Sequence, residues 1–195
     1  TMNDVIMLCT TVDRTFMAGL DYLEGARKMK IPLVRAGIIN PGMHWEHIQQ
    51  YKVTTLVSVP SYLLKLLNFA KENNIDPAKT SVQKILCIGE NIRDENNVLN
   101  IIGEKILKIW DVKLYGTYAS TEMQTAFTEC SYGVGMHHIP GLIICELLDE
   151  EGNEVTEGEV GELTITHLGV EGMPLLRFRT GDICILDKKT CECGR

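Results

Sequence analysis

A candidate nucleotide-binding segment covers residues 116–122, directly after an apolar run that is typical of a strand. Small residues and hydroxyls just past a strand end allow backbone N–H groups to reach phosphate oxygens. The ring of Tyr118 stands four residues before the carboxylate of Glu122, so the ring could stack on a base while the carboxylate holds Mg²⁺. A plain connection between two strands has the same composition, and both interpretations stay open.

Asp182 is a second candidate, because it follows a Thr-Gly pair at the start of an apolar run. An Asp in this position often only closes a turn. The same carboxylate can accept hydrogen bonds from two ribose hydroxyls, as acidic residues do in other nucleotide sites. We find no nucleophile–base pair in the sequence, and interpret the remaining polar-helix and strand-end histidines as surface or packing residues (His44, His47 and His167).

Two short pairs offer ligands for a metal ion. Cys191 and Cys193 form a Cys-x-Cys pair, and Cys130 and His137 form a second pair. Four N and S ligands from two separate pairs suit a tetrahedral structural Zn²⁺, which we predict here with His137 preferred over His138. The alternative is a buried thiol at Cys130 and a histidine on the surface.

Alternating strand and helix patterns must position these residues. Up to residue 115, short apolar β-branched runs alternate with amphipathic patterns, which predicts a mainly parallel, doubly wound α/β sheet. Ligands of such sheets lie at the carboxyl ends of the strands. We expect strands at residues 5–8, 31–34, 54–59, 84–88 and 112–115. We expect helices at 15–30, 42–51, after Pro60 with Ser61 as the cap, and from about 94 to 107.

After about residue 140 the pattern changes to short strands without helices between them, at 142–148, 162–167, 175–179 and 183–186. This predicts a small antiparallel β subdomain. We therefore expect a nucleotide- and acyl-binding α/β portion at 1–128, a β subdomain at 129–190 and a zinc-ligand segment at 191–195 that leads to a further domain.

The composition excludes several classes of protein. The chain has 195 residues, 45% hydrophobic and 23% charged, which suits a packed core and argues against disorder. A net charge of −7 argues against a partner held by phosphate contacts, as nucleic acid is. No apolar run approaches the roughly 18 residues of a membrane span. Seven cysteines and no signal-peptide pattern lead us to expect a cytoplasmic protein with reduced thiols.

A series of motifs runs along nearly the whole chain: Pro60-Ser61-Tyr62, Ile75-Asp76-Pro77, Gly89-Glu90, Tyr118 to Glu122, Glu129-Cys130, Gly135-Met136-His137, Gly161-Glu162-Leu163, and Met173-Pro174-Leu175 followed by Arg177 to Asp182. Their order and spacing resemble the adenylate-forming acyl-CoA synthetases, and more narrowly the phenylacetate–CoA ligase branch. Relatives in this branch also carry the Cys-x-Cys-Gly-Arg and Glu-Cys…His patterns of the predicted zinc site.

The resemblance implies roles for single residues. Gly89, Glu90 and Asn91 would form one wall of an adenine pocket, and Tyr118 would stack on the other face of the base. The rest of that loop would meet the phosphates, with Thr121 in contact with them and Glu122 binding Mg²⁺, while Asp182 would hold the ribose. Two departures stand out: Asn91 replaces the family's more usual proline, and Ala119, before Ser120, replaces its glycine and restricts the backbone there.

The activity implied by the resemblance is ATP-dependent activation of an aryl or arylacetic carboxylate. The carboxylate attacks the α-phosphate to give acyl-AMP, and CoA then displaces AMP to give the thioester. The implied cofactors are ATP/AMP, Mg²⁺, CoA and structural Zn²⁺, and a homodimer stays open. An acceptor other than CoA, or a nucleotide-binding module without catalysis, are the alternatives. The family's phosphate loop and lysine-bearing C-terminal domain fall outside these residues, so we expect the 195 residues alone to be inactive.

Overall fold

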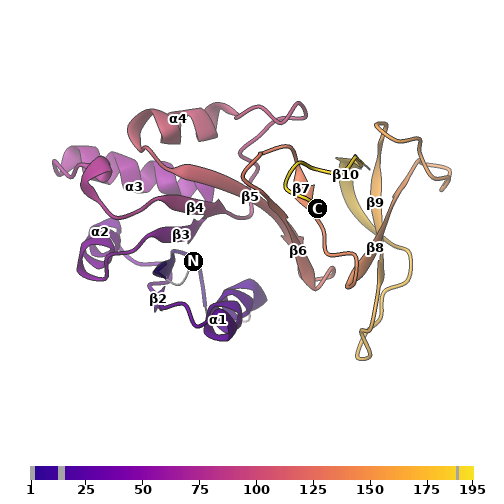
Figure 1. The fold of residues 1–195 in the computed structure, drawn as a ribbon, viewed down its shortest axis with the longest axis horizontal. Coiled ribbons are helices and arrows are strands. Elements are labelled where there is room, and N and C mark those ends of the chain that lie inside the picture. The colour runs from indigo at the N-terminus through magenta and orange to yellow at the C-terminus, as the bar shows by residue number, and fades with distance from the viewer. Residues whose placement is uncertain (1–2, 13–15, 188) are drawn as a thin grey trace. The chain divides into compact units, whose positions relative to one another are not determined.

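The computed structural model describes residues 3–12, 16–187 and 189–195. The chain divides into two compact units, Thr1–Tyr118 and Ala119–Arg195 (Figure 1). The boundary expected at residue 128 therefore lies inside the second unit, which also contains the segment 191–195. No helix within the described residues has the length and apolar character that crossing a membrane requires.

The first unit is built on five parallel strands in the order β2-β1-β3-β4-β5, which confirms the predicted doubly wound sheet. The strands are β1 (Ile6–Leu8), β2 (Leu33–Arg35), β3 (Thr55–Ser58), β4 (Lys84–Cys87) and β5 (Lys113–Ser120). The helices are α1 (Met17–Met29), α2 (Pro41–Gln50), α3 (Pro60–Glu72) and α4 (Ile101–Ile109), with a short 3₁₀ turn η1 (Pro77–Lys79).

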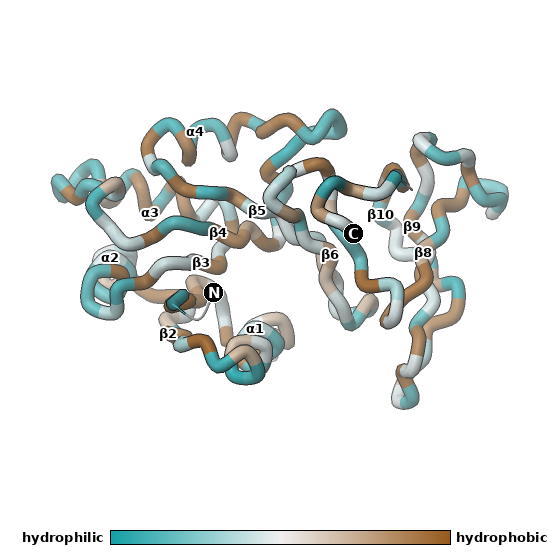
Figure 2. Tube along the Cα trace, in the orientation of Figure 1, coloured by the Kyte–Doolittle hydropathy of each residue, from teal (hydrophilic) through white to brown (hydrophobic). Residues whose placement is uncertain are grey.

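Alternate residues of these strands face two apolar layers. Met7, Leu56 and Ile85 point into a core shared with side chains of α2, α3 and α4. Their neighbours Leu8 and Val57 point the other way, into a smaller cluster that includes Tyr22 of α1. This alternation follows from the two-residue period of a strand. Helices therefore cover both faces of the sheet, and hydrophobic stretches run along its strands in Figure 2.

The helix expected from about residue 94 begins later, at Ile101. The Asn100 side chain accepts hydrogen bonds from the backbone N–H groups of Ile102 and Gly103, both at 3.0 Å, and so caps the helix. Asp94 instead accepts from Asn96 and Val98 and closes a turn before the helix. Short polar side chains can make either motif, and the sequence pattern did not distinguish the two.

The second unit contains β6 (Thr125–Glu129), which pairs antiparallel with β7 (Met136–His137). A separate antiparallel sheet has the order β10-β9-β8, which confirms the expected small β part. Its strands are β8 (Ile143–Leu148), β9 (Val160–His167) and β10 (Phe178–Ile185). The two short strands expected at 175–179 and 183–186 are in fact one strand with an irregularity between Arg179 and Ile183.

Candidate functional site

The turn after β4 and the far end of β5 lie on neighbouring parallel strands. Cys87, the last residue of β4, is paired with Gly116 of β5. Gly89 and Tyr118 each stand two residues beyond this pair. The register thus brings two of the predicted nucleotide-binding residues to the carboxyl edge of adjacent strands, where doubly wound sheets bind their ligands.

The turn itself depends on Gly89. Its φ is +73°, a left-handed conformation that a side chain disfavours. A Cβ at this position would meet no described atom within 4 Å, so the backbone angle and not crowding accounts for glycine here. The carbonyl oxygen of Asn91 accepts a hydrogen bond of 2.7 Å from the side chain of Asn100, which joins the turn to the start of α4.

Glu90 is engaged by the first turn of α3. Its carboxylate accepts hydrogen bonds from the backbone N–H and the hydroxyl of Ser61, at 2.8 and 2.7 Å. Ser61 is not the N-cap that its sequence position suggested, because α3 begins at Pro60 and Val59 occupies the N-cap position. The sequence signal that could have revealed this contact is the Pro-Ser start, which leaves N–H groups that favour a nearby anion.

The segment expected as a loop at residues 116–122 is extended as far as Ser120, so that prediction was wrong for the first five of its seven residues. Ala119 lies in this strand and not at a positive φ, so replacing the family's glycine does not strain the backbone. The Ser120 hydroxyl oxygen accepts a hydrogen bond from Met123 N–H at 3.2 Å, which shapes the turn. Thr121 and Glu122 occupy this turn with exposed side chains.

Asp182 lies in the irregular part of β10. Its backbone N–H donates to the Thr180 hydroxyl at 3.1 Å, and that hydroxyl donates to the carbonyl of Leu163 at 2.8 Å. Gly181 has a φ of +81°, so the turn requires glycine at this place. Asp182 thus lies in a bulge that is fixed to β9.

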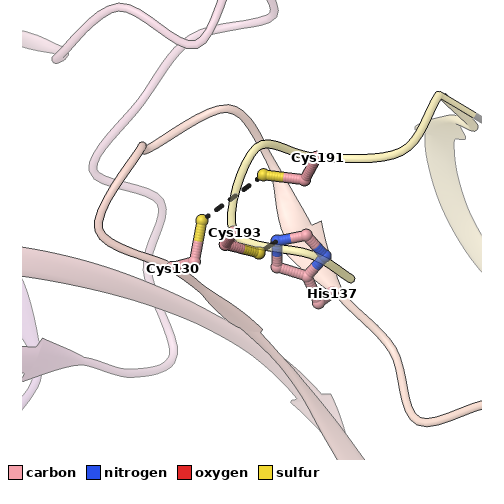
Figure 3. A group of neighbouring side chains, drawn as sticks. All are labelled: Cys130, His137, Cys191 and Cys193. Atoms are coloured by element: carbon pink, nitrogen blue, oxygen red, sulfur yellow. Dashed lines mark hydrogen bonds between the residues drawn. The ribbon is translucent and has the colours of Figure 1, made fainter.

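The four predicted zinc ligands come together in the second unit (Figure 3). Their ligand atoms all lie within 4.8 Å of one another. Cys130 Sγ is 3.7 Å from Cys191 Sγ, and Cys193 Sγ is 3.4 Å from His137 Nε2. Zn–S and Zn–N bonds of about 2.3 and 2.0 Å in a tetrahedron imply separations of about 3.8 and 3.5 Å, so the donor set fits a zinc ion.

Backbone geometry explains how distant residues form this cluster. The pairing of Glu129 with Met136 places the adjoining Cys130 and His137 on neighbouring chain segments. At the C-terminal side, Cys191 N–H donates to the carbonyl of Arg195, and Gly194 N–H donates to that of Cys191, both at 2.9 Å. These bonds close a tight turn that presents both thiols.

The surroundings of Cys130 favour the thiolate form of its side chain. Burial raises its pKa, but hydrogen bonds from the Tyr132 N–H and from the His137, Cys191 and Cys193 side chains outweigh burial and lower the pKa to about 6. The thiolate is the form that binds metal. His138 lies outside the cluster, with its ring 5.8 Å from that of Phe127.

His44 is a residue whose surroundings the sequence did not reveal. It is fully buried, with Nε2 3.2 Å from the carbonyl of Gly37 and Nδ1 2.7 Å from the Tyr62 hydroxyl. The carbonyl can only accept, so Nε2 carries the proton and Nδ1 accepts from Tyr62. The helix pattern around residue 44 is polar, and no local signal indicates a buried imidazole.

Comparison of the sequence with known proteins identifies the family of this chain. Residues 25–172, more than half of the chain, match the family described as AMP-binding enzyme. The chain belongs to this family. This AMP-binding chain is 28% identical over 187 residues to the phenylacetate–coenzyme A ligase of Thermus thermophilus, covering 92% of this chain and 40% of that protein.

Two further curated relatives are similar to this AMP-binding chain. The phenylacetate–coenzyme A ligase of Aromatoleum evansii is 28% identical over 186 residues, with coverage of 92% and 40%. The indoleacetate–lysine synthetase of Pseudomonas savastanoi is 26% identical over 149 residues, with coverage of 75% and 33%. The chain thus spans about 40% of the length of the ligases that it matches.

Solved structures share the fold of this AMP-binding chain. An open conformation of 2-hydroxyisobutyryl-CoA ligase in complex with 2-HIB-AMP and CoA gives a TM-score of 0.85 at 22% identity, covering 100% of this chain and 46% of that one. A benzoate CoA ligase from Burkholderia xenovorans LB400 gives 0.71 at 20% identity, covering 94% and 39%. At these identities the likeness establishes the fold alone.

Proposed function

We propose that this chain provides the adenosine-binding part of an ATP-dependent acid–thiol ligase that activates an aryl or arylacetic carboxylate. The observation that carries the proposal is the register of β4 and β5, which sets Gly89 and Tyr118 at equivalent positions beyond one residue pair. Membership of the AMP-binding family and similarity to two phenylacetate–CoA ligases support it.

The adenine is bound by the Gly89–Glu90–Asn91 turn and by Tyr118. Anchoring by Ser61 and Asn100 holds this turn between α3 and α4, so its backbone forms a rigid edge for the base. The Tyr118 ring supplies a flat apolar face for stacking. The Glu90 side chain contributes by fixing the turn, since its carboxylate is bonded to Ser61.

Thr121 and Glu122 interact with the phosphates of ATP, Thr121 directly and Glu122 through Mg²⁺. A hydroxyl can donate to a phosphate oxygen, and a carboxylate is the hard oxygen ligand that Mg²⁺ prefers. Glu122 would hold the Mg²⁺ ion, which when bound neutralises phosphate charge. The carboxylate of Asp182 accepts hydrogen bonds from the ribose hydroxyls.

The reaction needs no nucleophile from the protein. A substrate carboxylate oxygen attacks the α-phosphorus of ATP and pyrophosphate leaves, giving acyl-AMP. The thiolate of CoA then attacks the acyl carbon, and AMP leaves as the thioester forms. The residues of this chain bind and orient the nucleotide, and positioning of this kind contributes a large part of the rate enhancement of such reactions.

Zn²⁺ has a structural role in this proposal. Cys130, His137, Cys191 and Cys193 fill all four positions of a tetrahedral ion, whereas a catalytic zinc keeps one position for water or substrate. The ion would tie the C-terminal turn to the β6–β7 segment. We also place the protein in the cytoplasm, because zinc-binding cysteines and buried thiols suit a reducing compartment.

An amine acceptor in place of CoA is a second candidate, favoured by the similarity to an indoleacetate–lysine synthetase. The test is product analysis with the full-length protein, ATP, Mg²⁺, both acceptors (CoA and lysine) and a panel of benzoate, phenylacetate, indoleacetate and 2-hydroxyisobutyrate. A CoA thioester of an aromatic acid supports the proposal. An amide formed from lysine supports the second candidate, and a thioester of 2-hydroxyisobutyrate alone contradicts the aromatic specificity.

A further inference from the structure

The bulge of β10 that contains Asp182 is unusually wide. Arg179 pairs with Thr164 of β9, and Ile183 pairs with Glu162, so only Leu163 of β9 faces the three residues between them. Bulges of this kind bend a strand and re-aim a side chain. The direction of the Asp182 carboxylate therefore depends on what holds the bulge in shape.

Glu162 holds the bulge from the opposite strand. Its Oε1 accepts a hydrogen bond of 2.9 Å from the backbone N–H of Gly181, the residue directly before Asp182. Its Oε2 accepts from Nε of Arg179 at 2.6 Å and forms an ion pair with a terminal nitrogen of the same guanidinium. One carboxylate thus binds the residue that opens the bulge and the residue in its middle.

Several contacts keep this carboxylate charged and in place. The hydrogen bond from Arg179 is the main cause that lowers the pKa of Glu162, with a further contribution from the Gly181 N–H. Arg179 also donates to the carbonyl of Asp149 at 3.1 Å, so the guanidinium is fixed from two sides. The Glu162 side chain is only 19% exposed.

We propose that Glu162 is a positioning residue that sets the Asp182 carboxylate for the ribose of ATP, an inference that rests on the proposed function. Oε1 of Glu162 holds the backbone of Gly181, and Oε2 holds the side chain of Arg179 at the start of the bulge. Without Glu162 the Gly181 N–H loses its partner and the bulge can relax. The carboxylate of Asp182 then no longer meets both ribose hydroxyls.

The neighbouring strand provides a matched control. Glu146 of β8 forms the same kind of pair with Arg177, through contacts of 3.1 and 3.2 Å. The Arg177 N–H is bonded to the Thr166 hydroxyl at 2.9 Å, so this pair is anchored away from residues 180–182. Glu146→Gln therefore removes a comparable charge pair from the same sheet without touching the bulge.

The test is calorimetric binding of ATP and of 2′,3′-dideoxy-ATP to the full-length protein and its variants. Wild type is expected to prefer ATP. Glu162→Ala should weaken ATP binding by about tenfold, equal to about 1.4 kcal/mol, and leave dideoxy-ATP binding unchanged. Glu162→Gln, which keeps an acceptor for the Gly181 N–H, should lose less, and Glu146→Gln should match wild type. In an Asp182→Ala background, Glu162→Ala should add no further loss.

Two results would overturn the inference while the proposed function stands: ATP affinity of Glu162→Ala within twofold of wild type, or an equal loss for both nucleotides. The latter would indicate a general structural role. A wild-type protein that binds both nucleotides equally would instead contradict the ribose role of Asp182, and with it this inference. Comparison of the wild-type preference with the variant preference separates the two failures.

Discussion

The carboxylate of Glu90 accepts hydrogen bonds from both the backbone N–H and the hydroxyl of Ser61, at 2.8 and 2.7 Å. These two contacts join the turn after β4 to the first turn of α3, 29 residues earlier in the chain. The positive end of a helix favours an anion at this place. One side chain thus stabilises a helix and fixes the turn that we assign to the adenine.

Replacing the Glu90 carboxylate should destabilise the start of α3 and weaken binding of the nucleotide at the turn after β4. Glu90→Ala should lower the free energy of unfolding by about 1–2 kcal/mol, because it leaves the N–H of the helix without its acceptor. It should also weaken AMP binding. Urea denaturation measures the first effect and calorimetry the second. The control is Glu95→Ala, which removes an exposed carboxylate from the same β4–α4 connection and should change the free energy of unfolding by less than about 0.5 kcal/mol. Equal stability of Glu90→Ala and wild type would contradict the role of Glu90 at the start of α3.

The buried His44 should make the fold sensitive to acid. Burial, reinforced by repulsion from His47, lowers the pKa of His44 to about 4 from an ordinary 6.5, although the bond to Gly37 opposes the shift. At pH values between about 4 and 6.5, the His44 imidazole therefore binds a proton more readily in the unfolded chain than in the folded protein. The contribution to stability is fully present above pH 6.5 and is lost as the pH falls to about 4.

A comparison of variants isolates this contribution. Over pH 7 to 4, the loss of unfolding free energy in wild type should exceed that in His44→Leu by about 2 kcal/mol, since carboxylates titrate alike in both proteins. His138→Leu, which removes an imidazole from the second unit, should behave as wild type. Parallel pH profiles for His44→Leu and wild type would show that His44 is not held neutral.

Zinc should be present and should stabilise the second unit. We expect about one zinc per chain in protein purified without a His-tag, and a melting temperature lower by more than about 5 °C after chelation. Cys191→Ser/Cys193→Ser should lose the metal. Cys184→Ser, which alters a thiol outside the cluster, should keep it. Elemental analysis measures the zinc content of wild type and of both variants. Less than about 0.2 zinc per wild-type chain would rule the site out.

Repeating patterns made much of the fold predictable. Strands β1, β3 and β4 follow from β-branched apolar runs, and α3 follows from Leu63, Leu66, Leu67 and Ala70, which recur at helical spacing and are all buried. The Cys/His cluster was predictable because few residue types ligate zinc and they occur here in two pairs.

Features that depend on long-range contacts were not predictable from local pattern. The cap of α3 comes from Glu90, and the continuous β10 depends on bonds between its bulge and β9. The start of α4 depended on which of Asp94 and Asn100 caps the helix and which closes a turn. For α3 and β10 the partner is distant in the sequence, and for α4 two short polar side chains both suit a cap, so tertiary structure decides the outcome.

The most direct test of the central claim is carboxylate-dependent exchange of pyrophosphate into ATP by the full-length protein. Wild type should catalyse exchange with an aromatic acid. Glu122→Gln should reduce the rate at least tenfold, about 1.4 kcal/mol of transition-state stabilisation, because an amide cannot offset the charge of Mg²⁺. Glu157→Gln, at another exposed glutamate of the second unit, should exchange at the wild-type rate. Exchange by Glu122→Gln equal to wild type would contradict the assignment of Glu122, and no exchange by wild type with any carboxylate would contradict the account as a whole.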